Sequence, residues 1–167
     1  MTDAEPQPDE TFIHTAVYRA RPDVMSVVHS HSNFSTAFTI AGKEIVPVCV
    51  HGAIFADGVP EYKYARKVIN REQGNDLAKV LGSHRALVMR MHGAVVVGAS
   101  LEEAFVAALQ LEENAEKQIL ATALGPVDRM TPAEVEEAIR ESFKPASIKK
   151  RWEFYEEREK HKRAAQH

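Results

Sequence analysis

The sequence has little cysteine, no long apolar run and no N-terminal pattern typical of a signal peptide. The single cysteine, Cys49, excludes an internal disulfide, which is typical of a protein in a reducing compartment. No apolar stretch approaches the ~20 residues that a membrane-spanning helix requires. The N-terminal sequence MTDAEPQPDE is acidic and contains proline, the reverse of the basic and then apolar start of a signal peptide. We therefore expect a cytoplasmic protein with no membrane partner.

The sequence also lacks an excess of either charge. Its 21 lysines and arginines stand against 24 aspartates and glutamates, a formal net charge of −3. This balance gives no reason to expect nucleic acid as a partner. With 167 residues, 44% of them hydrophobic and 27% charged, the chain is typical of one soluble domain. We expect that domain at residues 9–144, between a flexible tail at 1–8 and a charged helix at 145–167.

Helical and strand-like patterns alternate along the domain. The sequence predicts a first helix that Asp9 caps and that runs to about Arg19. It predicts further helices over residues 33–42, 71–82, 101–124 and 131–143. It predicts strands at 24–31, 45–50, 62–65, 86–91 and 94–99, the second of them near an edge because of its proline. Some strands are too close together for helical crossovers. We therefore expect an α/β fold with a mixed sheet covered by helices.

Three histidines lie at strand ends. His29 and His31 have the H-x-H spacing at the end of one apolar strand, so their side chains project to the same face ~6–7 Å apart. His92 ends a second apolar strand and is followed by Gly93, where the backbone can turn sharply. Any one such histidine is usually a packed side chain, but three together favour a metal site. Three neutral imidazoles with an open position are typical of catalytic metal sites.

An acidic residue, Glu10, opens the first helix, where the helix dipole favours its ionised form. A carboxylate near a metal-bound substrate can act as a general base. His14 follows four residues later and shares this helix face. The alternative is an ordinary carboxylate on a solvent-facing helix, and the residues alone leave both interpretations open.

Two further residues are candidate substrate contacts. His51 opens a glycine-rich loop at 51–61 and could reach a substrate. Arg90 precedes His92 on its strand and could bind a substrate anion. A structural role is the alternative for both, in the case of Arg90 an ion pair.

The order of these residues resembles the class II aldolase/adducin family. In that family an acidic residue opens a helix that leads through an arginine–proline–acid turn into the H-x-H strand, and a third histidine precedes a glycine between two strands. The resemblance runs from about Glu10 to Leu124, and the matching positions are Glu10, Arg21-Pro22-Asp23, His29, His31 and His92-Gly93.

The resemblance implies a three-layer α/β/α sandwich with a central mixed, largely antiparallel sheet. It implies a divalent metal held by His29, His31 and His92, most often zinc and sometimes manganese or cobalt, with Glu10 as the proton carrier. The expected activity is that of a lyase that breaks a carbon–carbon bond of a small-molecule substrate through a metal-stabilised enolate. The reaction would be aldol cleavage, or decarboxylation of a hydroxy, keto or hydroxy-aromatic acid. The family pattern further implies a homotetramer with active sites between subunits, which Tyr155 in the C-terminal helix could reach.

Two features depart from the family pattern. Family members carry a longer stretch before the acidic position, with loops that bind a substrate phosphate, whereas this sequence begins nine residues before Glu10. We therefore expect either a truncated form or a substrate that is not held through a phosphate. The segments MHGAVVVG and GVPEY, with Trp152 and Tyr155, are closer to the branch of hydroxy-aromatic acid decarboxylases.

Two alternatives to a lyase stay open. A catalytically inactive adducin-like binding module is favoured by the short N-terminal region, while the complete set of three histidines with Glu10 argues against it. A sugar-phosphate epimerase or dehydratase on the same scaffold would use the same metal.

Overall fold

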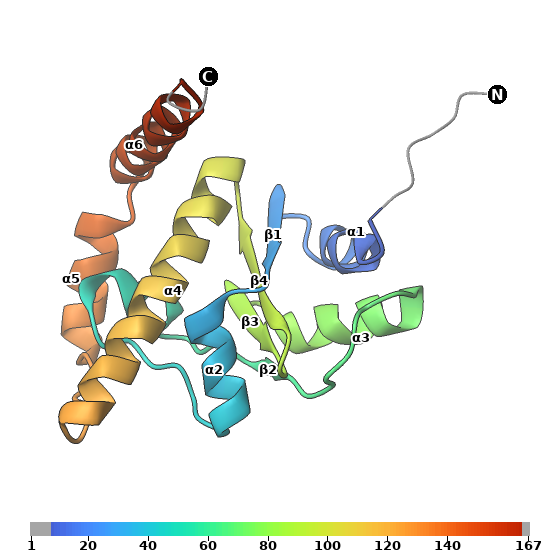
Figure 1. Cartoon of the computed structure of the whole chain (residues 1–167), viewed down its shortest axis with the longest axis horizontal. Helices are drawn as coiled ribbons and strands as arrows, with labels where there is room; N and C mark the ends of the chain where they lie inside the picture. The colour runs from blue at the N-terminus through green and yellow to red at the C-terminus, as the bar shows by residue number, and fades with distance from the viewer. Residues whose placement is uncertain (1–7, 165–167) are drawn as a thin grey trace.

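The computed structural model describes residues 8–164 and consists of a small sheet with helices on both sides (Figure 1). The strands are β1 (Ser26–Ser30), β2 (Glu61–Tyr62), β3 (Ala86–Met89) and β4 (Gly93–Gly98). The helices are α1 (Thr11–Ala20), α2 (Asn33–Ala41), α3 (Arg71–Leu81), α4 (Leu101–Leu124), α5 (Pro132–Ser142) and α6 (Pro145–Ala164), with a short 3-10 helix η1 (Val50–Phe55). The flexible tail predicted for residues 1–8 lies, apart from Pro8, outside the described residues.

The four strands lie in the order β1-β4-β3-β2. β1 pairs antiparallel with β4, with His29 opposite Val95 and Ser30 opposite Ala94. β3 and β4 are also antiparallel, because the short connection between them permits only a hairpin. β2 pairs parallel with β3. The prediction of a mixed, largely antiparallel sheet is therefore confirmed.

Alternate residues of β3 and β4 enter two separate hydrophobic cores, as the period of a strand requires. Leu87 and Val95 face α1 and α3, in a core with Ile13, Val17, Leu77 and Leu81. Val88 and Val96 face α2, α4 and η1, in a core with Phe38, Phe55, Ala107 and Leu111. The sheet thus forms the middle layer of the predicted α/β/α sandwich.

The strand predicted over residues 45–50 does not form. This segment runs between α2 and η1, and its backbone bonds buried amide side chains of α4. The Asn114 carboxamide accepts from the backbone N–H of Val48 (3.0 Å) and donates to the carbonyl of Val46 (2.8 Å). The Gln118 carboxamide accepts from the backbone N–H of Val46 (2.9 Å). The apolar pattern of the segment reflects burial, and side-chain amides stand in for a neighbouring strand.

This arrangement makes Asn114 important for stability. We expect Asn114→Ala to lower the free energy of unfolding by about 2–3 kcal/mol, because it leaves the carbonyl of Val46 and the N–H of Val48 without their partners. Denaturant unfolding measures the loss. The matched control is Glu116→Ala on the exposed side of the same helix, where a change within about 0.5 kcal/mol is expected. A loss at Asn114 no larger than in this control would contradict the prediction.

Most helix ends follow the sequence signals, but the start of α1 does not. Thr131 and Glu134 form the capping box of α5, and Ser100 caps α4. Glu10, not Asp9, is the N-cap residue of α1, and its side chain makes no capping bond. The predicted Asp9 cap is therefore wrong, and the Glu10 carboxylate points away from the helix end.

The C-terminal helix α6 contacts α4, and Figure 1 shows it at the edge of the fold, after α5. The rings of Trp152 and Tyr155 meet Phe105 of α4 edge-on, with centroids 5.4 and 5.6 Å apart. No residue of α6 is buried. The division at residue 144 between the domain and this helix stays a prediction. Among the described residues, no helix is both long and apolar enough to cross a membrane.

Candidate metal centre

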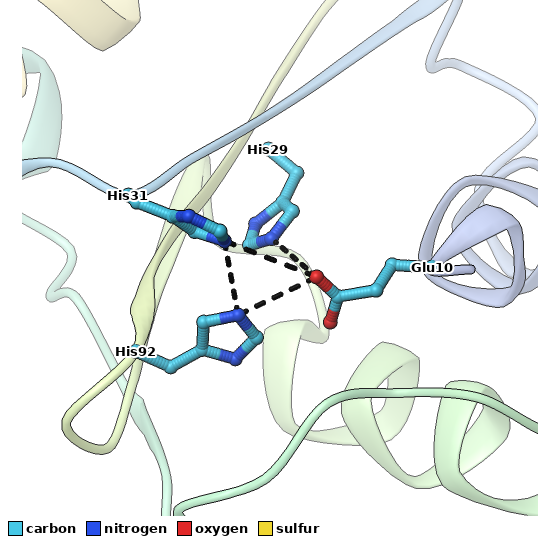
Figure 2. Close-up of side chains that lie close together, drawn as sticks. All are labelled: Glu10, His29, His31 and His92. Atoms are coloured by element: carbon cyan, nitrogen blue, oxygen red, sulfur yellow. Dashed lines mark hydrogen bonds and ion pairs between the residues drawn. The ribbon is translucent and has the colours of Figure 1, made fainter. Parts of the chain in front are cut away.

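Four side chains meet where β1 ends, between the start of α1 and the β3–β4 turn (Figure 2). Glu10 comes from α1, His29 from β1, His31 from the residue after β1, and His92 from the turn. Oε2 of Glu10 lies 3.2 Å from Nε2 of His29, 3.4 Å from Nε2 of His92 and 3.9 Å from Nε2 of His31. The Nε2 atoms of His31 and His92 are 3.1 Å apart. Residues far apart in the sequence thus direct one polar atom each toward the same small volume.

The backbone of the β3–β4 turn brings His92 to this place. A Cβ on Gly93 would lie 2.2 Å from the carbonyl oxygen of Ser30, so a larger residue would push the turn away from β1. Met91, two residues earlier, has φ of 54°, in the left-handed region that non-glycine residues rarely adopt. Glycine and this turn therefore hold His92 close to the end of β1.

Backbone carbonyls fix the proton position on two of the imidazoles. Nδ1 of His29 lies 3.0 Å from the carbonyl oxygen of Ala94, and Nδ1 of His92 lies 3.1 Å from that of Arg66. Because a carbonyl oxygen can only accept, each Nδ1 must carry the hydrogen. In the neutral imidazole the lone pair is then on Nε2, which faces the cluster. Metal-ligating histidines commonly have such an outer hydrogen bond.

In these states Oε2 of Glu10 and the Nε2 atoms of His29 and His92 are all acceptors. A carboxylate oxygen and an imidazole lone pair 3.2 Å apart repel each other unless a proton or a cation lies between them. A divalent cation at the centre satisfies every one of these lone pairs at once. The donor set, three nitrogens and an oxygen, suits a divalent transition metal.

The separations also fit a metal. Zinc–nitrogen bonds of ~2.0–2.1 Å in tetrahedral geometry place neighbouring ligand atoms ~3.3 Å apart. Four of the six separations between ligand atoms, 3.1–3.9 Å, bracket this value, and all six lie within 4.8 Å. The cluster therefore fits a divalent metal in both chemistry and spacing.

The two oxygens of Glu10 have different partners. Oε1 accepts a hydrogen bond from the backbone N–H of Val68 (3.0 Å), which leaves Oε2 to face the histidines. Burial raises the pKa of this carboxyl, but the Val68 N–H and the neighbouring His29 and His92 lower it more, so the pKa lies below its ordinary value. The carboxylate is therefore ionised at neutral pH.

A cavity of about 350 Å³ opens beside the cluster, lined by Pro8, Asp9, Glu10, His14, His29, Ser30 and His31. His14 was not among the predicted site residues. The pKa of the His14 imidazole is held below its ordinary value, mainly by burial and to a smaller extent by the nearby His29. Its imidazole is then neutral and can donate or accept a hydrogen bond in the cavity. The four-residue spacing from Glu10 was the signal in the sequence that placed it on this face.

The three other candidate residues lie elsewhere in the chain. His51 bonds Glu113 of α4 (2.7 Å) and, together with Tyr155, lines a different cavity of about 690 Å³ against α6. Arg90 follows β3 and bonds the carbonyl of Tyr62 through its backbone N–H (3.0 Å). Between described residues, no hydrogen bond or ion pair joins His51, Arg90 or Tyr155 to the four-residue cluster.

The fold and the cluster define a class of α/β proteins with a histidine–carboxylate site, and comparison with known proteins identifies the family. Residues 1–119 match the class II aldolase and adducin N-terminal domain. The chain therefore belongs to the class II aldolase and adducin family.

Relatives in this family differ in function. The chain is 33% identical to 3,4-dihydroxyphthalate decarboxylase of Terrabacter sp. (strain DBF63) over 132 residues, which are 76% of this chain and 55% of the relative. It is 37% identical to gamma-adducin of Rattus norvegicus over 119 residues, 70% of this chain and 17% of the relative. The structure of L-fuculose 1-phosphate aldolase from Glaciozyma antarctica PI12 aligns with a TM-score of 0.70 at 24% identity and covers 84% of this chain and 53% of that chain. The aldolase likeness confirms the predicted fold, and the chain spans about half the length of each of the two enzymes.

Proposed function

We propose that the chain acts as a divalent-metal-dependent lyase that breaks a carbon–carbon bond in a small hydroxy, keto or hydroxy-aromatic acid. The observation that carries the proposal is the convergence of Glu10, His29, His31 and His92 on one point, with two Nε2 lone pairs fixed by outer hydrogen bonds. The family supports it, because its members include a decarboxylase.

In this proposal His29, His31 and His92 hold the cation, with zinc as the first expectation and manganese or cobalt as alternatives. The bound cation supplies Lewis-acid stabilisation of the negative charge that develops on a substrate oxygen. The carbonyls that accept from Nδ1 of His29 and His92 orient these imidazoles and direct Nε2 toward the cation.

Glu10 is the proton carrier in either reaction, because its lowered pKa keeps a base available at neutral pH. In aldol cleavage, Oε2 accepts the proton of the substrate hydroxyl as the carbon–carbon bond breaks and the aldehyde carbonyl forms. The electron pair stays on the other carbon, which then takes up a proton. In decarboxylation, the bond to the carboxylate breaks, carbon dioxide leaves, and the carbon receives a proton that Glu10 relays from water.

Product analysis distinguishes the two reactions. Purified protein loaded with zinc or manganese is incubated with hydroxy-aromatic acids and with hydroxy acids that can undergo aldol cleavage. We expect a chelator-sensitive product: carbon dioxide without an aldehyde indicates decarboxylation, and a trapped aldehyde indicates aldol cleavage. An epimerised or dehydrated sugar phosphate would instead support the other enzyme class. Absence of any product from both kinds of acid would contradict the lyase.

An adducin-like binding module is the second candidate function, favoured by the 37% identity to gamma-adducin of rat. Such a module would keep the fold without turnover. Turnover separates the two candidates, because an inactive module with the same donor cluster can also be loaded with metal. Stoichiometric metal with measurable turnover supports the lyase.

We also propose a cytoplasmic homotetramer with the metal centre between subunits. The His31 side chain is 65% exposed although the cluster needs it, so a second subunit could cover it. Tyr155 and His51, which do not reach the cluster in their own chain, could contact the centre of a neighbouring subunit. Light scattering coupled to size-exclusion chromatography tests this, and a monomer at micromolar concentration would contradict it.

A further inference from the structure

Helix α2 links the segment that carries His31 to the turn that carries His92. It begins at Asn33, two residues after His31, and runs alongside α4 (Figure 1). Near its other end, Thr39 contacts Met91, the residue before His92. A shift of this helix would therefore move both His31 and His92.

The N-terminus of α2 is capped by a residue of another helix. Its own N-cap residue, Ser32, makes no capping bond, and its hydroxyl pairs with that of Ser30 (2.9 Å). Instead, the carboxylate of Glu112 on α4 accepts from the backbone N–H groups of Phe34 (2.9 Å) and Ser35 (2.8 Å). A carboxylate at this end is also favoured by the helix dipole. Glu112 thereby ties the segment that carries His31 to α4.

Thr39 holds the turn that carries His92. Its buried hydroxyl donates to the carbonyl of Thr36 (2.7 Å) and accepts from the backbone N–H of Met91 (2.9 Å). Met91 has the left-handed backbone, which is unfavourable for a residue with a side chain. The bond from Thr39 offsets part of this cost and fixes the backbone directly before His92.

We propose that Glu112 and Thr39 are positioning residues that act through α2 to hold His31 and His92 at ligand spacing, with their Nε2 atoms 3.1 Å apart. Neither side chain touches the centre. The inference rests on the metal site of the proposed function, and it assigns to α2 a role in metal affinity beyond its role in the fold.

Thr39→Val tests the contact to Met91, because valine keeps the shape and removes the hydroxyl. The matched control is Thr36→Val, one turn earlier on α2, whose buried hydroxyl has no hydrogen-bond partner among the described residues. Affinity for Co²⁺ is measured by competition with a chelator, and the visible absorption of bound Co²⁺ reports the coordination geometry. We expect Thr39→Val to bind ~10–100-fold more weakly with an altered spectrum, as for other outer contacts of metal ligands. Thr36→Val should match the wild type in affinity and spectrum. Thr39→Ser, which keeps the hydroxyl, should show the wild-type Co²⁺ spectrum.

Glu112→Gln tests the cap, against Glu116→Gln on an exposed position of the same helix. We expect weaker Co²⁺ binding only in Glu112→Gln, with circular dichroism unchanged in the metal-free protein. Wild-type affinity and spectrum in both Glu112→Gln and Thr39→Val would overturn the positioning role alone. Equal loss in Thr36→Val would assign the effect to general packing and overturn it too. A wild-type protein that binds no Co²⁺ would overturn the metal site itself.

Discussion

Replacing His92 by alanine is expected to abolish stoichiometric metal binding. The imidazole supplies one of three nitrogens, and its Nε2 lies 3.1 Å from that of His31 and 3.4 Å from Oε2 of Glu10. Its loss leaves two imidazoles and the Glu10 carboxylate, one donor fewer than the complete cluster. We expect affinity to fall by at least ~100-fold, beyond the usual effect of outer contacts. Metal per chain is measured by mass spectrometry after dialysis against zinc, with about one ion expected for the wild type.

The control for this experiment removes a histidine that lies away from the cluster. His161 is exposed on α6, and His161→Ala should keep the wild-type stoichiometry. His29→Ala should fail in the same way as His92→Ala, because its Nε2 also faces Glu10. Thermal unfolding of the metal-free proteins separates lost ligands from lost fold. Wild-type stoichiometry in both His29→Ala and His92→Ala would eliminate the three-histidine site.

The parts of the site that could be predicted from the sequence depend on short-range geometry. The H-x-H spacing places His29 and His31 on one face because the side chains of a strand alternate. The glycine after His92 predicts a sharp turn there, whereas the structure shows that it is needed for the close approach to the carbonyl of Ser30. The roles of these residues as metal ligands stay predictions, since the geometry shows only that they meet.

Other features could not be predicted because they depend on partners distant in the sequence. The apolar segment 45–50 has the composition of a strand, and nothing local shows that Asn114, 66 positions from Val48, takes the place of a neighbouring strand. The cap of α2 by Glu112 joins residues that are 78 positions apart. In the sequence Glu112 is an acidic residue on a mostly apolar helix face, and an ordinary surface residue would look the same. The four-residue spacing places His14 on one helix face with Glu10, but only the fold shows that this face borders a cavity.

Replacing Glu10 by glutamine should separate proton transfer from metal binding. Glutamine has the same shape, and its amide oxygen can still accept from the N–H of Val68, so the start of α1 should stay in place. The three imidazoles remain, so metal should be retained, while an amide cannot carry the proton. We expect turnover to fall ~10²–10⁴-fold, the usual contribution of a positioned acid or base. Metal content and steady-state rate are measured on the same preparation.

Asp9→Asn is the matched control, because Asp9 lines the same cavity and its carboxylate pairs with the exposed Lys67 (3.1 Å) instead of the histidines. Its turnover should stay close to that of the wild type. Unchanged turnover in Glu10→Gln would remove the role of proton carrier. If Glu10→Gln loses both metal and turnover, Glu10 is itself a metal ligand. The distances from its Oε2 to the Nε2 atoms of His29 and His92 are those expected between two ligands of the same ion. Retained metal with lost turnover is the only result that assigns the binding of the cation to the histidines and the movement of the proton to the carboxylate.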